Sequence, residues 1–227
     1  MHRTIPAALA VVASLAIPAV AQAKFIQVGE TGDDAPPSCP TNTQANPCQA
    51  IARTTGYQVR DGAWRDQFVV PEAGRIVAWR IQLSQPTADQ VRFFDRNYGS
   101  PSARLTILRP GRSLTATVVA QSPSISLAPY FGQTIDVALD RTLAVRKGQI
   151  VALTVPTWAP ALATQTGRSD VSWRASRSPK DPKQCGAKNV LSSQSAQTRV
   201  GRRARYGCLY QQALITYSAT LVTRRAG

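Results

Sequence analysis

Histidine and methionine are almost absent from this sequence. Its 227 residues contain one of each, Met1 and His2, at the very start of the chain. Histidine is the general base of the usual serine and cysteine triads and the commonest zinc ligand. Glutamate is nearly absent too, with only Glu30 and Glu72 to serve a carboxylate-pair hydrolase. These absences disfavour the common hydrolase mechanisms, and we expect no catalytic residue, metal site or cofactor.

Acidic residues are few. Asp and Glu number 12 against 27 Lys and Arg, which gives a formal net charge of +15. The hydrophobic share of 43% is enough to bury a core, so wholesale disorder is excluded. Such an excess of positive charge favours partners that carry negative charge.

Long apolar runs occur only at the N-terminus. Arg3 precedes the uncharged run from Ile5 to Val20, and Ala21 to Ala23 forms the small-x-small pattern that signal peptidase cleaves. A membrane anchor is the alternative, but the run is short and contains two prolines. We therefore expect residues 1–23 to be a cleaved signal peptide. The mature protein is then secreted, extracellular or associated with the cell envelope, with no transmembrane segment.

The chain has four cysteines, an even number that favours disulfides in an exported protein. They are Cys39, Cys48, Cys185 and Cys208. Three pairings are possible, and proximity in sequence suggests the first with the second and the third with the fourth. A zinc site of four thiolates is the alternative, but the sequence has no Cys-x-x-Cys pair.

The chain divides into an arm and one domain. Gly, Pro, Asn, Thr and Asp are abundant before residue 48, so we expect residues 24–56 to be an N-terminal arm with a disulfide loop. Residues 57–227 show the pattern of a single all-β domain. In Arg75–Leu83, apolar residues alternate with polar ones, which is typical of a half-buried strand.

Seven further runs indicate strands: Gln67–Val70, Ala103–Leu108, Ala116–Gln121, Thr134–Leu139, Ile150–Val155, Val171–Ala175 and Leu209–Val222. Most are bounded by Gly, Pro or Asn. Many short strands with regular turn signals predict an antiparallel β-sandwich, which we expect to be of jelly-roll type.

One or two short helices interrupt this pattern. Between Pro86 and Gly99, Thr87 and Gln90 fit a capping box and Gly99 can end the helix. A weaker helix start lies at Asn46, with proline at the next position.

The sequence resembles uncharacterised secreted proteins of high-GC bacteria. The resemblance is carried by Gly56–Val59, Arg75–Asp95, Val151–Ala163 and Trp173–Arg177, and it extends over most of the mature chain. These relatives have no known activity, so the resemblance implies a secreted context and no site.

Positive charge is concentrated in residues 168–205, hereafter the basic segment, where ten basic residues face two acidic ones. The residues that we expect to bind a ligand are Arg174, Arg177, Lys180, Lys183, Lys188, Arg199, Arg202, Arg203 and Arg205. Outside the cell they would bind an anionic envelope polymer or polysaccharide, without specificity for nucleic acid. The alternative is a solvated loop without a partner.

Three aromatic residues in loops are the second candidate site. Trp158 lies between two prolines, and Tyr130 and Phe131 precede Gly132. Aromatic rings on sandwich loops can stack on sugar faces, although rings in such places more often cap the core. The other tryptophans lie in strand patterns and are expected in the core or on a sheet face: Trp64, Trp79 and Trp173.

Two weaker hypotheses concern acids and tyrosines. Asp136 and Asp140 end a strand and could bind calcium, but an ion pair with an arginine is favoured in so basic a chain. Tyr206, Tyr210 and Tyr217 lie near arginines and could support lyase chemistry on acidic sugars.

The sequence thus predicts a secreted, monomeric, non-enzymatic module that binds anionic or carbohydrate polymers. A histidine-free polysaccharide lyase and a structural envelope protein without a ligand site are the alternatives.

Overall fold

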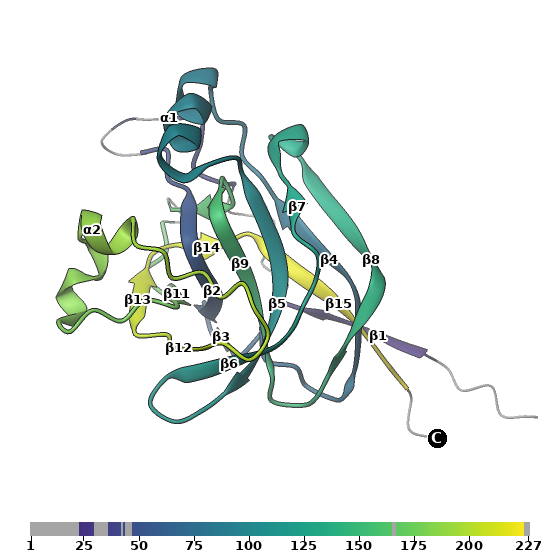
Figure 1. Cartoon of the computed structure of the whole chain (residues 1–227). Helices are drawn as coiled ribbons and strands as arrows, with labels where there is room; N and C mark the ends of the chain where they lie inside the picture. Colours follow the sequence, from purple (N-terminus) through teal and green to yellow (C-terminus); the bar gives the residue numbers. More distant parts are fainter. Residues whose placement is uncertain (1–22, 30–35, 42, 44–46, 165–166, 225–227) are drawn as a thin grey trace, which may run out of the picture.

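The computed structural model describes residues 23–29, 36–41, 43, 47–164 and 167–224 (Figure 1). Its architecture is all-β, with antiparallel sheets that enclose one main core. The all-β, sandwich-like class expected from the sequence is therefore confirmed. Among the described residues, no helix is long and apolar enough to cross a membrane.

The first sheet has the strand order β1-β15-β4-β8 and forms one side of the molecule (Figure 1). Its strands are β1 (Ala23–Val28), β15 (Tyr217–Arg224), β4 (Gly74–Gln82) and β8 (Thr134–Val145). All neighbouring strands in this sheet are antiparallel.

The second sheet follows the order β12-β6-β5-β9-β2-β11-β13, with two short strands beside this path. Its strands are β12 (Arg203–Arg205), β6 (Thr115–Gln121), β5 (Ser102–Pro110), β9 (Ile150–Ala159), β2 (Ile51–Asp61), β11 (Val171–Ala175) and β13 (Cys208–Gln211). The side strands are β3 (Trp64–Arg65), paired with β2, and β7 (Ile125–Ser126), paired with β5. A separate small ladder joins β10 (Leu162–Ala163) to β14 (Leu214–Ile215).

Helices are short and lie outside the sheets. They are α1 (Ala88–Tyr98), α2 (Lys188–Leu191) and the 3-10 turns η1 (Ala128–Tyr130) and η2 (Pro182–Gly186). Helix α1 begins with the predicted capping box, in which Thr87 and Gln90 bond each other's backbone amides, and ends at Gly99 with φ of 86°. Residues 47–50 form no helix, and Asn46 lies outside the described residues.

The core lies between the sheets, and a register irregularity in β4 after Ile76 buries Ile76 in place of Val77. Ile76, Trp79 and Ile81 of β4 are each at most 1% exposed, and Leu105 and Leu153 come from the opposite sheet with no exposed surface. Burial of such side chains is the main stabilising contribution, at roughly 2 kcal/mol each.

The N-terminal part is more regular than the sequence indicated. Residues of the expected arm form β1 at the edge of the first sheet, and β2 begins at Ile51 and crosses the expected boundary at residue 57. Two predicted strands also differ. Gln67–Val70 forms a turn with one isolated bridge at Val69, and Leu209–Val222 is divided among β13, β14 and β15.

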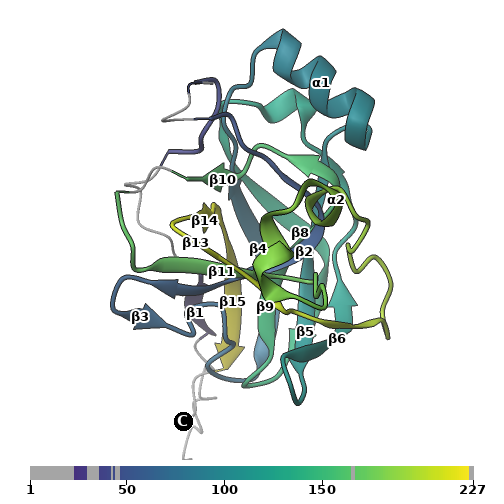
Figure 2. The ribbon, with the colours of Figure 1, turned by 90° about the vertical axis from the view of Figure 1, so that its left-hand side faces the viewer.

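Both disulfides pair as proximity suggested. Cys39 bonds Cys48 near helix α1, and Cys185 of η2 bonds Cys208 of β13. The second bond ties the basic segment to the end of the second sheet (Figure 2).

Candidate functional site

Within the basic segment, the chain leaves the second sheet after β11 and returns to it at β12. It contains η2 and α2, which project away from the sheets on the side opposite β8 (Figure 1). Its return strand β12 pairs with β6 and extends the edge of the sheet. The segment is thus held by a disulfide at one point and by a strand at another.

Arg177 does not belong to the exposed surface of this segment. Its residue is only 5% exposed, and its guanidinium donates hydrogen bonds to the carbonyl oxygens of Ala52, at 2.5 Å, and Leu191, at 2.7 Å. Burial lowers the pKa of this guanidinium. The expectation that Arg177 binds a ligand is therefore wrong, because its donors join strand β2 to helix α2 inside the protein.

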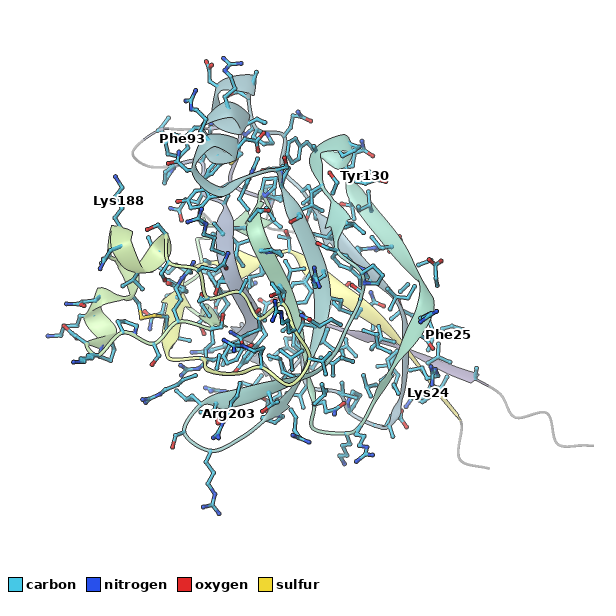
Figure 3. All side chains as sticks on the ribbon, in the orientation of Figure 1. Lys24, Phe25, Phe93, Tyr130, Lys188 and Arg203 are labelled. Carbon is cyan, nitrogen blue, oxygen red and sulfur yellow. A yellow bond between two sulfur atoms is a disulfide. The ribbon has the colours of Figure 1, made fainter. Side chains whose placement is uncertain are left out.

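Seven other members of the predicted set are exposed: Lys180, Lys183, Lys188, Arg199, Arg202, Arg203 and Arg205. In the part of the chain that the structure describes, ion pairs engage only Lys24, Arg80, Arg92 and Arg168 among the cations. Figure 3 shows Lys188 on the outer side of α2 and Arg203 beside β6. These charges face solvent rather than a protein carboxylate.

A small hollow of about 320 Å³ lies within the segment. Arg174, Lys180 and Arg205 line it together with the disulfide-bonded Cys185, and no acidic residue lines it. Arg174 is half-buried, and its Nη1 donates to the Tyr206 carbonyl oxygen at 3.2 Å. Three converging cations suit a phosphate, sulfate or carboxylate group, since guanidinium binds such groups through paired hydrogen bonds.

A row of positive charge extends from the segment onto the sheet. Arg203 of β12 lies opposite Thr117 of β6, and Thr117 lies opposite Arg109 of β5. Directly opposite residues in antiparallel strands share one face, so Arg109 and Arg203 flank Thr117 on the same surface. Both arginines are exposed. Sequence reasoning missed Arg109 because 94 residues separate it from Arg203 and only the sheet brings them together.

Beyond Arg109 lies a wide cleft of about 1210 Å³. Arg109, Arg146 and Lys147 contribute cations to it, while Val77 and Val119 contribute apolar surface. It opens between the two sheets, near the turn that joins β8 to β9. The cationic row therefore leads from the basic segment to a second cationic surface.

The loop aromatic residues do not form a binding platform. Trp158 has no exposed surface, because Phe94 of α1 stacks on it at 4.7 Å and Phe131 packs at 5.6 Å. The expectation that Trp158 stacks on a sugar is wrong, since helix α1 covers the end of β9. Tyr130 is 39% exposed and Phe131 is partly buried, so these two residues stay a prediction.

The remaining tryptophans lie in the core or on the surface of a strand, as expected. Trp79 and Trp173 are buried, as the strand patterns indicated. Trp64, on the short strand β3, is 70% exposed, whereas the other three tryptophans are buried.

The tyrosines of the lyase hypothesis are internal. Tyr206 and Tyr217 are at most 2% exposed, and the Tyr217 hydroxyl donates to the Val151 carbonyl oxygen at 3.0 Å. Tyr210 is half-buried, and its hydroxyl donates to the Cys185 carbonyl oxygen at 2.9 Å. Burial raises the pKa of all three phenols. Tyr206 and Tyr217 are therefore shielded from a polymer at the surface, and the Tyr210 hydroxyl already bonds a backbone carbonyl.

Of the two acids in the ion-pair hypothesis, Asp136 pairs with an arginine, whereas no ion pair within the described residues involves Asp140. Arg80 donates two hydrogen bonds of 2.8 Å to the carboxylate of Asp136, its cross-strand neighbour. This hydrogen bonding holds the pKa of Asp136 below its usual value. Among the described residues, no three His, Cys, Asp or Glu side chains cluster to hold a metal ion.

Comparison with known proteins adds no function. No protein-family model matches the sequence, and no curated protein or solved structure shows a significant match. The resemblance to secreted proteins of high-GC bacteria therefore stays a prediction.

Proposed function

We propose that the protein is an exported, non-enzymatic module that binds an anionic polymer outside the cell. The observation that carries this proposal is the set of seven exposed cations on the basic segment, none of which pairs with a carboxylate of the described chain. Unpaired surface cations raise the local positive potential, which attracts and retains polyanions.

Export is part of the proposal. The predicted signal peptide supports it, and two disulfides within the described residues fit an oxidising compartment. The anionic partners available there include phosphate-bearing wall polymers and acidic polysaccharides, which share closely spaced negative groups.

A polymer suits the arrangement better than a small anion. The hollow lined by Arg174, Lys180 and Arg205 can hold one anionic group, and the row from Arg203 to Arg109 offers further cations along the sheet. Several weak contacts on one chain add up through effective concentration.

The test is retention of the mature protein on heparin and on isolated bacterial cell wall across a salt gradient. We expect tight, salt-sensitive retention, because each contact releases a counterion. The triple variant Arg202→Ala, Arg203→Ala, Arg205→Ala should elute at distinctly lower salt than the unchanged protein.

A matched control removes the same charge elsewhere. Arg65, Arg96 and Arg141 are exposed, and none of them lines the cleft near Arg109 or the hollow within the basic segment. Their triple alanine variant should elute close to the unchanged protein. If both triple variants shift equally, only net charge matters and the proposed surface is wrong. If neither the protein nor the variants are retained, the function is wrong.

A further inference from the structure

Trp64 is exposed although tryptophan is usually largely buried. It is the first residue of β3, in a hairpin whose two-residue turn is Gly62 and Ala63. Gly62 has a φ of 63°, as such tight hairpin turns require. The indole is 70% exposed, so the core gains little from it.

A charged pair lies beside this indole. Asp61 is the cross-strand partner of Trp64, and directly opposite side chains share a face of the hairpin. The Asp61 side chain is only 8% exposed, and its Oδ1 lies 2.6 Å from Nη2 of Arg168. A Cβ on Gly62 would come within 2.7 Å of the same Nη2, so the glycine leaves room for the guanidinium.

These groups line a hollow of about 670 Å³. Gln27 of β1 and Gln67 complete its wall together with Asp61, Trp64 and Arg168. The Gln67 Oε1 is buried and has no hydrogen-bond partner among the described residues, which is costly for an amide acceptor. Because Gln67 lines the hollow, a hydroxyl bound there is a candidate donor to this acceptor.

We propose that this hollow binds a neutral sugar ring. A pyranose has an apolar face that stacks on an indole and equatorial hydroxyls that both donate and accept hydrogen bonds. Trp64 supplies the stacking surface, Asp61 and Gln67 accept, and Gln27 and Arg168 lie at the wall as polar partners.

Charge distinguishes this site from the basic segment. Among the described residues, the charged ones that line the hollow are Asp61 and Arg168, and their charges cancel. Arg168 also donates to Asp170, at 3.2 Å from its Nε. The hollow therefore offers an acidic sugar no excess positive charge, and a neutral ring fits it better.

Membrane insertion of Trp64 is the competing explanation for an exposed indole. Arg65 and Asp66 follow Trp64 directly, and both are exposed. Insertion into lipid would carry these charges toward the hydrocarbon, which is unfavourable. The polar side chains that line the hollow, such as Gln27 and Gln67, would find no hydrogen-bond partners in the hydrocarbon of a bilayer.

The sugar site is independent of the proposed function, because it uses none of the cations of the exposed set. The experiment monitors the indole Nε1–H signals of the mature protein by NMR. The probes are soluble neutral oligosaccharides, namely gluco-, galacto-, manno- and chito-oligosaccharides, and phosphatidylcholine vesicles. We expect one oligosaccharide class to shift the Trp64 signal in a saturable way.

Three variants make the test specific. Trp64→Ala should weaken binding at least about tenfold, which corresponds to 1.4 kcal/mol. Asp61→Asn, of nearly the same shape, should also weaken it. Phe93→Ala removes an exposed aromatic ring from α1, which lies at the opposite end of the molecule from β3 (Figure 2), and should leave affinity within about twofold.

Several results would overturn the sugar site. They are the absence of any oligosaccharide shift at Trp64, unchanged affinity in Trp64→Ala, or a Trp64 response to vesicles alone. Heparin retention of Trp64→Ala should equal that of the unchanged protein, so a failure of the sugar site is distinguishable from a failure of polyanion binding.

Discussion

The indole Nε1–H of Trp158 donates a hydrogen bond to the Asp95 carboxylate, 2.9 Å away, and so joins the end of β9 to helix α1. Phe94, the preceding helix residue, stacks on the same ring. Two neighbouring residues of α1 thus contact one buried tryptophan and attach the helix to the end of β9.

Replacement of Trp158 by phenylalanine should destabilise the protein. The change removes a hydrogen bond to a charged acceptor and leaves unfilled volume under α1, so we expect a loss of about 2–4 kcal/mol in the free energy of unfolding. Urea denaturation measures it. Trp64→Phe is the control, since its exposed ring should change stability by less than about 0.5 kcal/mol. Equal losses in both variants would contradict the assignment of Trp158 to the core.

Arg177→Met should destabilise the basic segment. Methionine fills similar volume but leaves the carbonyl oxygens of Ala52 and Leu191 without their donor, at a cost of about 1–3 kcal/mol for each unpaired group. Arg199→Met, at an exposed position of the same segment, should be nearly neutral. Both variants are compared by urea denaturation. If they are equally stable, the structural role of Arg177 is wrong.

Loss of the disulfide between Cys185 and Cys208 should lower both stability and polyanion retention. The bond spans 23 residues, for which loop-closure entropy predicts about 3 kcal/mol. The double alanine variant should unfold at lower urea and leave heparin at lower salt, because the cations are no longer held together. Removal of the bond between Cys39 and Cys48 should lower stability without changing heparin retention. The opposite pattern would place the binding surface elsewhere.

The pair of Arg80 and Asp136 should contribute a small, pH-dependent stability. Both side chains are more than half exposed, so the contribution at neutral pH is under about 1 kcal/mol. The folded-state pKa of Asp136 lies below its unfolded value of about 3.9, so the contribution is complete above that pH. It is lost as the pH falls through the lowered pKa. Arg80→Gln should therefore match the unchanged protein near pH 2, and a difference that persists there would refute this account.

Alkaline titration should show that Tyr206 and Tyr217 ionise only when the protein unfolds. Burial raises the folded-state pKa of Tyr206 and Tyr217, so the stability that their neutral forms provide is complete below the unfolded pKa of about 10. It declines as the pH rises above that value. Tyrosinate absorbance from these two residues should appear together with loss of near-ultraviolet circular dichroism. Their ionisation in a fully folded protein would show that they are accessible, and it would revive the lyase hypothesis.

The sequence pattern correctly predicted those features that depend on interactions between residues close together in the chain. The alternation in Arg75–Leu83 predicted β4, and the spacing of Thr87 and Gln90 predicted the start of α1. The disulfide partners are also near one another in sequence. The pairing of Asp136 with an arginine followed from composition alone, because arginine is the commonest cation here.

Exposure could not be predicted in the same way. Trp158 lies in a proline-flanked segment that suggested a loop, yet it has no exposed surface. Trp64 lies in a strand pattern that left open the core or a sheet face, and it is 70% exposed. The reason is that a ring is buried by what packs over it. Helix α1 covers Trp158, whereas the hairpin leaves Trp64 at the mouth of a hollow.

The sequence by itself determined the strand pattern, the helix cap, the partners of the disulfides and the excess of positive charge. Only the tertiary structure decided that Arg177 is internal, that Arg109 and Arg203 flank one threonine, and that Asp61 and Trp64 share a face. Propensity and charge belong to single residues and short windows. Burial and proximity depend on strands and helices that are distant in the chain, so they arise only when the sheets assemble.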